Sequence, residues 1–263
     1  DKLIHLFDKN TFEHLASSTY QGQGPGEITI IGHVGIDETN RRFFVSDHGK
    51  LKIFAYDLDS VLTTPEYQPS VKIDMKKKLF PDDYLYLNDT LCIARIIEPI
   101  GNNDYKPSVA RWNMATGEIN PMPYEYPDLK KVRFIYAASA EHQLYVQCYT
   151  QYDLMTICDF NGNLKCNIYG PKWVNEKTQT QHYSLGVEFC GDKILALYSG
   201  GDHRTDAYYP TKFLVFDLNG NYLKTLETGY MITDFCYDKE NNRLIINLND
   251  EIQFAYLDLE GII

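Results

Sequence analysis

The chain has 263 residues, of which 36 are acidic and 25 are basic, for a formal net charge of −11. This balance argues against nucleic acid and anionic membranes as partners, because both are bound mainly through Lys and Arg. No apolar run approaches the roughly 18 residues that span a bilayer. The 21 tyrosines favour β structure and suit binding surfaces.

The chain opens on a strand-like segment, residues 1–7, with no charged-then-apolar leader before it. We therefore expect that a leader has been removed and that some upstream structure is missing.

A first class of turn recurs along the whole chain. In each copy an Asp or Asn follows an apolar stretch and precedes Gly or polar residues, which supply the positive φ of a tight hairpin. The copies are Asp8-Lys9-Asn10-Thr11, Asp57-Leu58-Asp59-Ser60, Asn113-Met114-Ala115-Thr116-Gly117, Asp159-Phe160-Asn161-Gly162, Asp217-Leu218-Asn219-Gly220 and Asp258-Leu259-Glu260-Gly261.

A second class of turn alternates with the last five copies of the first. These are polar turns before β-branched or aromatic runs: Asn40-Arg41-Arg42, Asn88-Asp89-Thr90, Glu141-His142-Gln143, Gly191-Asp192-Lys193 and Asn241-Asn242-Arg243. Each unit thus has the order strand, polar turn, strand, loop, strand, Gly turn, strand, with about 44 residues per unit. No convincing helical stripe of 10–12 residues interrupts this order, which excludes an alternating β and α arrangement.

This pattern predicts an all-β fold, a six-bladed β-propeller of four-stranded antiparallel blades that forms one domain over residues 1–263. Radial closure would protect the edges of more than twenty strands. The first blade is expected to lack its two inner strands, and the last to end as its fourth strand begins. The alternative is a five-bladed ring with a composite closing blade.

The opening segment adds a resemblance. Leu3-Ile4-His5-Leu6-Phe7-Asp8 followed by Gly22-Gln23-Gly24-Pro25-Gly26-Glu27 resembles the start of the six-bladed TolB-like propellers of Bacteroides-type bacteria. The resemblance covers about 30 residues in detail and the later blades only in turn pattern. It implies a secreted, often lipid-anchored protein in the periplasm or at the cell surface, with a lipid anchor on the removed leader, and it implies no catalytic residues.

Several motifs do not match the chemistry that they suggest. Gly22–Glu27 lacks the final Gly and the helix of a phosphate loop, so we interpret it as a connector between blades. The turns at Asp159 and Asp217 lack the Gly and Glu of a calcium loop. The six cysteines form no tight pairs, which disfavours zinc. Cys158 and Cys166 flank one predicted hairpin and are the only pair that we consider for a disulfide. The sequence therefore predicts no catalytic residue, no metal and no cofactor.

The predicted site comes from architecture instead. In a propeller, loops between second and third strands share one face with the connectors between blades, and here they are the long segments: residues 97–107 and 199–210, with a shorter one at 149–153 and the connector 170–176. The opposite face is expected to carry only tight turns. The predicted ligand-binding residues are His48, Asp104, Tyr105, Tyr149, Tyr152, Trp173, Asp202, His203, Arg204, Asp206, Tyr208 and Tyr209.

Aromatic rings with flanking acids and amides suit sugars or peptides. We therefore expect a non-enzymatic envelope propeller that binds a protein, peptide or glycan on its long-loop face. One alternative is a carbohydrate-active hydrolase or lyase that uses acids with His203 or His48. Another is a structural subunit of a larger assembly, joined through its acidic flank or an unpaired blade edge.

Overall fold

The computed structural model describes residues 2–101, 104–127, 129 and 132–263. The chain divides into two compact units, Asp1–Pro121 (unit 1) and Met122–Ile263 (unit 2). Each unit is a series of antiparallel sheets made from consecutive strands. A single domain over residues 1–263 stays a prediction.

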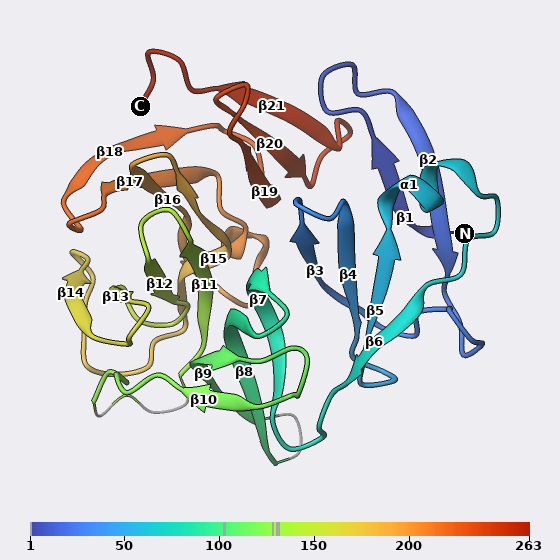
Figure 1. Ribbon diagram of the computed structural model, residues 1–263. Helices are drawn as coiled ribbons and strands as arrows, with labels where there is room; N and C mark the ends of the chain where they lie inside the picture. The colour runs from blue at the N-terminus through green and yellow to red at the C-terminus, as the bar shows by residue number, and fades with distance from the viewer. Residues whose placement is uncertain (1, 102–103, 128, 130–131) are drawn as a thin grey trace. The chain divides into compact units, whose positions relative to one another are not determined.

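Unit 1 contains a two-stranded hairpin and two four-stranded sheets, in the orders β1-β2, β3-β4-β5-β6 and β10-β9-β8-β7 (Figure 1). Its elements are β1 (Lys2–Phe7), β2 (His14–Tyr20), β3 (Ile31–Asp37), β4 (Arg42–Asp47), β5 (Lys52–Asp57), α1 (Leu58–Thr63), β6 (Ser70–Asp74), β7 (Phe80–Asn88), β8 (Leu91–Gly101), β9 (Asp104–Trp112) and β10 (Ile119–Pro121).

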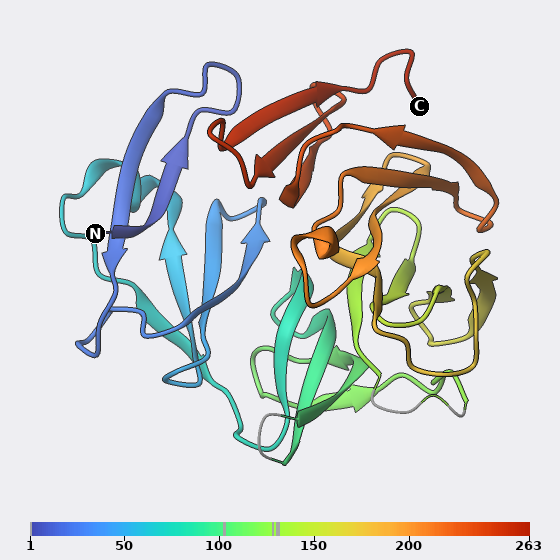
Figure 2. The ribbon, with the colours of Figure 1, turned by 180° about the vertical axis from the view of Figure 1, so that it is seen from behind.

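Unit 2 contains two four-stranded sheets and one three-stranded sheet, in the orders β11-β12-β13-β14, β15-β16-β17-β18 and β19-β20-β21 (Figure 2). Its elements are β11 (Phe134–Ser139), β12 (Leu144–Tyr149), β13 (Leu154–Asp159), β14 (Leu164–Tyr169), β15 (Thr180–Cys190), β16 (Lys193–Asp202), the 3-10 helix η1 (Asp206–Tyr208), β17 (Lys212–Asp217), β18 (Tyr222–Glu227), β19 (Ile232–Asp238), β20 (Arg243–Leu248) and β21 (Phe254–Asp258).

In the four-stranded sheets the first class of turn lies between the third and fourth strands, and its acidic or amide residue accepts backbone N–H groups of the turn. Oδ1 of Asp217 accepts the backbone N–H groups of Asn219 and Asn221 at 2.8 and 2.9 Å. Oδ1 of Asp159 accepts those of Asn161 and Asn163 in the same way. This local bonding explains why Asp recurs, because a short carboxylate satisfies turn N–H groups that no strand reaches.

The second class of turn joins first to second strands, and four of its five copies carry a left-handed residue. Arg41, Gln143, Gly191 and Asn242 have φ values of 50°, 55°, 58° and 47°. Their neighbours in space are the third-to-fourth turns: the N–H of Phe160 donates to the carbonyl of Gln143, and that of Leu259 donates to Asn242. The two classes of turn therefore meet at the same end of each sheet, as the predicted strand order requires.

Consecutive sheets pack face to face through their first strands. β3 lies beside β7, β11 beside β15, and β15 beside β19. A Cβ built on Gly35 of β3 would lie 2.4 Å from the ring of Tyr84 in β7, and one on Gly186 of β15 would lie 2.8 Å from Phe235 in β19. An aromatic side chain of one sheet therefore occupies the space over a glycine of the neighbouring sheet, where a larger residue would not fit. This is close packing of the kind found in protein cores.

Three predicted segments differ in the structure. The turn at Asp57 is the short helix α1, because the Asp57 carboxylate accepts the N–H of Ser60 as an N-cap and the chain continues as a helix. One of the predicted tight turns is therefore wrong. The predicted loop 97–107 is mostly a continuation of the β8-β9 hairpin, in which Glu98 pairs with Lys106. The predicted loop 199–210 begins as the end of β16, which pairs up to Asp202, and it includes η1.

The remaining local predictions concern cysteines and connectors. All six cysteines are free thiols, including Cys158 and Cys166; the backbone register pairs Cys158 with Leu164 instead. Residues 22–27 do connect β2 to β3, and Lys50 Nζ donates to the carbonyls of Gly24 and Glu27 at 2.8 and 2.7 Å. A basic side chain therefore already fills the turn that resembled a phosphate loop.

Two glycines in turns of one sheet allow the energetic cost of backbone strain to be distinguished from the cost of steric crowding when each is replaced by Ala. Gly220 and Gly191 both have positive φ, but a Cβ on Gly220 would lie 2.8 Å from Ile168 of the neighbouring sheet, whereas one on Gly191 would meet nothing within 4 Å. We expect Gly191→Ala to cost about 1–2 kcal/mol of unfolding free energy from strain alone. Gly220→Ala should cost about 1–3 kcal/mol more, because it also overpacks the contact between the sheets. Urea denaturation measures both, and equal losses would contradict this account.

Candidate functional site

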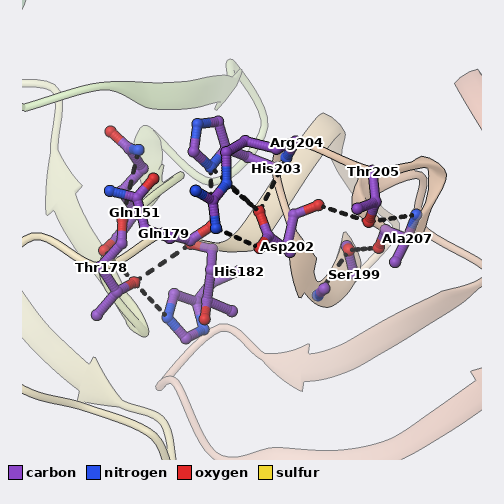
Figure 3. A network of polar contacts seen from close by, with 12 residues as sticks. Gln151, Thr178, Gln179, His182, Ser199, Asp202, His203, Arg204, Thr205 and Ala207 are labelled. Carbon is purple, nitrogen blue, oxygen red and sulfur yellow. Dashed lines mark hydrogen bonds and ion pairs between the residues drawn. The ribbon is translucent and has the colours of Figure 1, made fainter.

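The long segments of unit 2 meet at one end of its sheets (Figure 3). The hydroxyl of Thr178 donates to the carbonyl of Gln151 at 3.1 Å, which ties the connector before β15 to the loop between β12 and β13. The N–H of His203 donates to the carbonyl of Gln179 at 3.1 Å, which adds the segment after β16. We call this surface the loop face of unit 2: residues 150–153, 169–179 and 202–211, together with Tyr126.

A buried polar group anchors the loop face. Asp153 and His182 are each only 1% exposed. Oδ2 of Asp153 accepts the N–H of Lys172 at 2.9 Å, and Oδ1 accepts the hydroxyl of Tyr198 at 3.3 Å. Nδ1 of His182 lies 3.3 Å from the same hydroxyl, and burial lowers the pKa of His182. Because this group is sealed from solvent, it fixes the loops and offers no atom to a ligand.

Next to the anchor lies an aromatic corner, made of Tyr126, Tyr152, Tyr169 and Trp173. The Trp173 ring centroid is 5.1 Å from that of Tyr169, 5.9 Å from Tyr126 and 6.3 Å from Tyr152. The hydroxyls of Tyr126 and Tyr169 lie 3.2 Å apart. Tyr152 is buried, whereas Tyr169 is 51% exposed, so the corner has a fixed base and an open side.

At one end of the loop face, the carboxylate of Asp202 is paired with a guanidinium from the same segment. Arg204 donates from Nη2 to Oδ2 of Asp202 at 2.9 Å, and its side-chain and backbone hydrogen bonds hold the pKa of Asp202 well below its usual range. Nδ1 of His203 donates to the carbonyl of Gln179 at 2.9 Å, which leaves Nε2 as the acceptor of the ring. This segment therefore presents a guanidinium and an imidazole held in place by a carboxylate and a carbonyl.

The other predicted residues of unit 2 are placed separately. The rings of Tyr208 and Tyr209 lie 4.2 Å apart, with their planes 31° from parallel. Tyr149 is buried at the end of β12, where it contacts Tyr126 and Phe134, so it supports the corner from below. The side chain of Asp206 lies outside the described part of the structure.

In unit 1, the predicted residues lie on two different sheets. Asp104 and Tyr105 begin β9, and the Tyr105 N–H donates to its neighbour's carboxylate. His48 lies between β4 and β5, with Nε2 3.8 Å from Oδ1 of Asp82. Its ring also contacts Phe80 at 5.8 Å between centroids.

His48 belongs to a charged cluster that the sequence did not predict. Asp82 accepts from Nε of Arg95 at 3.0 Å, and Asp83 lies 3.0 Å from Nδ1 of His33. A register shift between Pro81 and Asp83 interrupts the regular pairing of β7 here. Two consecutive Asp residues in an apolar strand could have indicated this cluster in the sequence. The bulge that brings both carboxylates to basic partners, however, depends on the pairing of β7 with β8.

Electrostatics fix the ionisation of this cluster. Burial alone would raise the pKa of Asp83, but the hydrogen bond from His33 and the charges of His33 and Arg95 lower it below its usual value. The carboxylates are thus matched by basic groups. Within the described ranges no group of three or more His, Cys, Asp or Glu side chains is arranged to hold a metal ion.

Of the predicted residues, the structure thus brings Tyr152 into ring contact with Trp173 and pairs Asp202 with Arg204. His203 is hydrogen-bonded to Gln179 of the connector that carries Trp173. Sequence reasoning missed Tyr126 and Tyr169, which complete the aromatic corner. Tyr169 is the last residue of an outer strand and Tyr126 belongs to a connector, so neither falls within the segments chosen by length. The aromatic residues around Trp173 were the only available signal.

Comparisons with known proteins agree with this architecture. A family model described as a 6-bladed beta-propeller (DUF5128) matches residues 4–89. A solved structure of a DUF4221 family member from Bacteroides vulgatus superimposes with a TM-score of 0.63 and 13% identity, over 97% of this chain and 86% of that one. No functionally curated protein matches the sequence.

A second solved structure is the extracellular domain of a Bacteroides thetaiotaomicron protein described as a hybrid two-component system. It matches 98% of this chain with a TM-score of 0.57 and 11% identity, and this chain spans 31% of its length. No described helix is long and apolar enough to cross a membrane.

The sheets and these likenesses establish an all-β propeller of four-stranded antiparallel blades, which confirms the predicted fold class. In the described part of the chain, five of the sheets have three or four strands, as in the five-bladed alternative, and β1-β2 is a separate two-stranded hairpin. The family that matches residues 4–89 is described as six-bladed.

Asp83 should make stability depend on acid. Its folded pKa is depressed, so its contribution is present above the ordinary value of 3.8 and is lost as pH falls through the folded pKa. We expect Asp83→Asn to be less stable than the wild type at pH 7 and the difference to shrink below about pH 4. Thermal unfolding from pH 7 to pH 3 measures this. Asp74→Asn, at an exposed carboxylate, is the control and should follow the wild type.

Proposed function

We propose that this protein is a non-enzymatic binding or scaffold propeller that recognises a protein, peptide or glycan on the loop face of unit 2. The observation that carries the proposal is the aromatic corner, where Trp173 presents an indole ring and Tyr169 a ring with a hydroxyl, beside loops held by a buried anchor. Rings of this kind bind apolar faces while their polar atoms fix orientation.

Rigidity supports this choice. Lys172 and Thr178, on either side of the corner's connector, are hydrogen-bonded to Asp153 and Gln151. A loop that is already ordered loses little conformational entropy when a ligand binds. Arg204 and His203 supply hydrogen-bond donors and an acceptor on the same face, which suits the hydroxyl or carboxylate groups of a sugar or a peptide.

We also propose that the protein is one of the TolB-like propellers and works outside the cytoplasm, in the periplasm or at the cell surface, with a lipid anchor on a leader. The resemblance of residues 1–27 supports the first point. The extracellular location stated for the Bacteroides thetaiotaomicron neighbour supports the second.

The enzymatic alternative has weaker support. Catalysis of glycoside cleavage needs two accessible carboxyl groups. On this face Asp153 is sealed and Asp202 is neutralised by Arg204.

Removal of the corner's rings tests the proposal. The purified protein is first applied to glycan and peptide arrays, and the strongest ligand is then titrated by calorimetry. We expect Trp173→Ala and Tyr169→Ala to weaken binding at least tenfold with little change in melting temperature, because aromatic anchors of this kind contribute about 2 kcal/mol or more. Tyr222→Ala, at an exposed tyrosine on β18, is the matched control and should bind normally. Unchanged binding in both corner variants would remove the site from this face.

A further inference from the structure

The rings of the aromatic corner stand at steep angles to one another. The plane of Trp173 is 60° from that of Tyr169 and 66° from that of Tyr126. The planes of Tyr126 and Tyr169 are 76° apart. The three rings therefore form the walls of a corner and not a flat platform. A sugar ring stacks on one flat aromatic face, whereas a compact group placed in a corner contacts several rings at once.

The distances between the rings fit one compact group. The ring centroids of Trp173 and Tyr169 are 5.1 Å apart, and the centroid of Tyr126 lies 5.9 Å from the first and 6.5 Å from the second. A single point can therefore lie within about 6 Å of all three centroids, which is the range over which a cation is attracted to an aromatic face. Because Tyr169 is 51% exposed, the corner can be entered from solvent on that side.

No basic side chain of the described residues lies over the two rings that line this entrance. Elsewhere the chain does place cations on its own aromatic residues, for example Lys2 with its Nζ 5.4 Å from the ring centroid of Tyr20. Within the described ranges, neither Trp173 nor Tyr169 has a contact of this kind. These two rings therefore have faces available to a cation from outside the chain.

The basic residue next to the corner in sequence is turned toward another strand. Lys172 directly precedes Trp173, but its Nζ lies 3.7 Å from the position that a Cβ on Gly200 of β16 would take. Three residues after Trp173, Glu176 is exposed and forms no ion pair in the part of the chain that the structure describes. The chain as a whole has a net charge of −11, which attracts cationic partners and speeds their association.

We propose that the aromatic corner receives a Lys or Arg side chain of a partner polypeptide, so that the ligand of the loop face is a basic peptide or a protein with a basic segment. The inference rests on the binding role proposed above and adds the chemistry of the ligand. The charged head lies against the electron-rich ring faces, among which the indole of Trp173 attracts a cation most strongly. The methylene stem of the same side chain packs on the apolar parts of the rings.

The test uses butylammonium as the probe, because it reproduces the stem and head of a lysine side chain. Butanol is the neutral match, and methyl glucoside represents a glycan. The chain has two tryptophans, so the indole N–H signal of Trp173 can be followed by nitrogen-15 NMR, with Trp112, 2% exposed in unit 1, as the internal reference. We expect butylammonium to shift the Trp173 signal saturably, and butanol to leave it unchanged at the same concentration. The Trp112 signal should not move.

Loss of one wall should weaken the probe. Tyr169→Leu and Tyr126→Leu should each lower the affinity for butylammonium about threefold or more, because each removes one ring face from the cation. The matched control is Tyr222→Leu, at a 56% exposed tyrosine of β18, and it should bind butylammonium like the wild type. On peptide arrays the strongest ligands should contain Lys or Arg, and replacement of that residue by norleucine should weaken binding about tenfold.

Three outcomes would overturn the inference. Equal shifts of Trp173 with butylammonium and butanol would show that apolar contact alone acts there. Affinity for butylammonium that Tyr169→Leu leaves unchanged would place the cation outside the corner. A shift with methyl glucoside and none with butylammonium would identify a glycan site, which contradicts a basic ligand but leaves the binding role of the loop face intact.

Discussion

The fold depends on one constraint: its sheets are apolar on both faces, so each is stable only when another sheet covers it. In β12 all six residues are buried, which is unusual for antiparallel strands, where one face commonly meets solvent. The contacts of Tyr84 with Gly35 and of Phe235 with Gly186 show how the cover is achieved. A ring from one first strand occupies the place of an absent side chain on the first strand of the sheet before it.

This constraint also explains why the loops are available for binding. Since the sheets fix both ends of every loop, the segments after β12, β14 and β16 are ordered by a few hydrogen bonds rather than by their own core. Asp153 and His182 provide such bonds from the buried side, where neither reaches solvent. The exposed ring of Tyr169 and the partly buried ring of Trp173 therefore pack on an ordered base. The proposed binding role rests on this combination of a buried polar anchor and neighbouring aromatic rings.

The sequence by itself determined the strand order, the all-β class and the positions of the turns, because these depend on local chemistry. Asp217 closes its turn through bonds to residues two and four positions away, and Gly220 supplies the positive φ that its turn requires. The carboxylate of Asp57 also accepts a backbone N–H group, but there it begins a helix and not a tight turn. Only the residues that follow the Asp distinguish a helix from a turn. The long segments were identified by length, but pairing decided that residues 97–107 extend a hairpin.

Only the tertiary structure decided the sites. The aromatic corner joins Tyr126 to Tyr169, 43 residues apart, and the cluster of His33 with Asp83 depends on the contact of two sheets and on a bulge. Local interactions fix strands and turns, whereas contacts between residues far apart in the chain exist only once the sheets have packed.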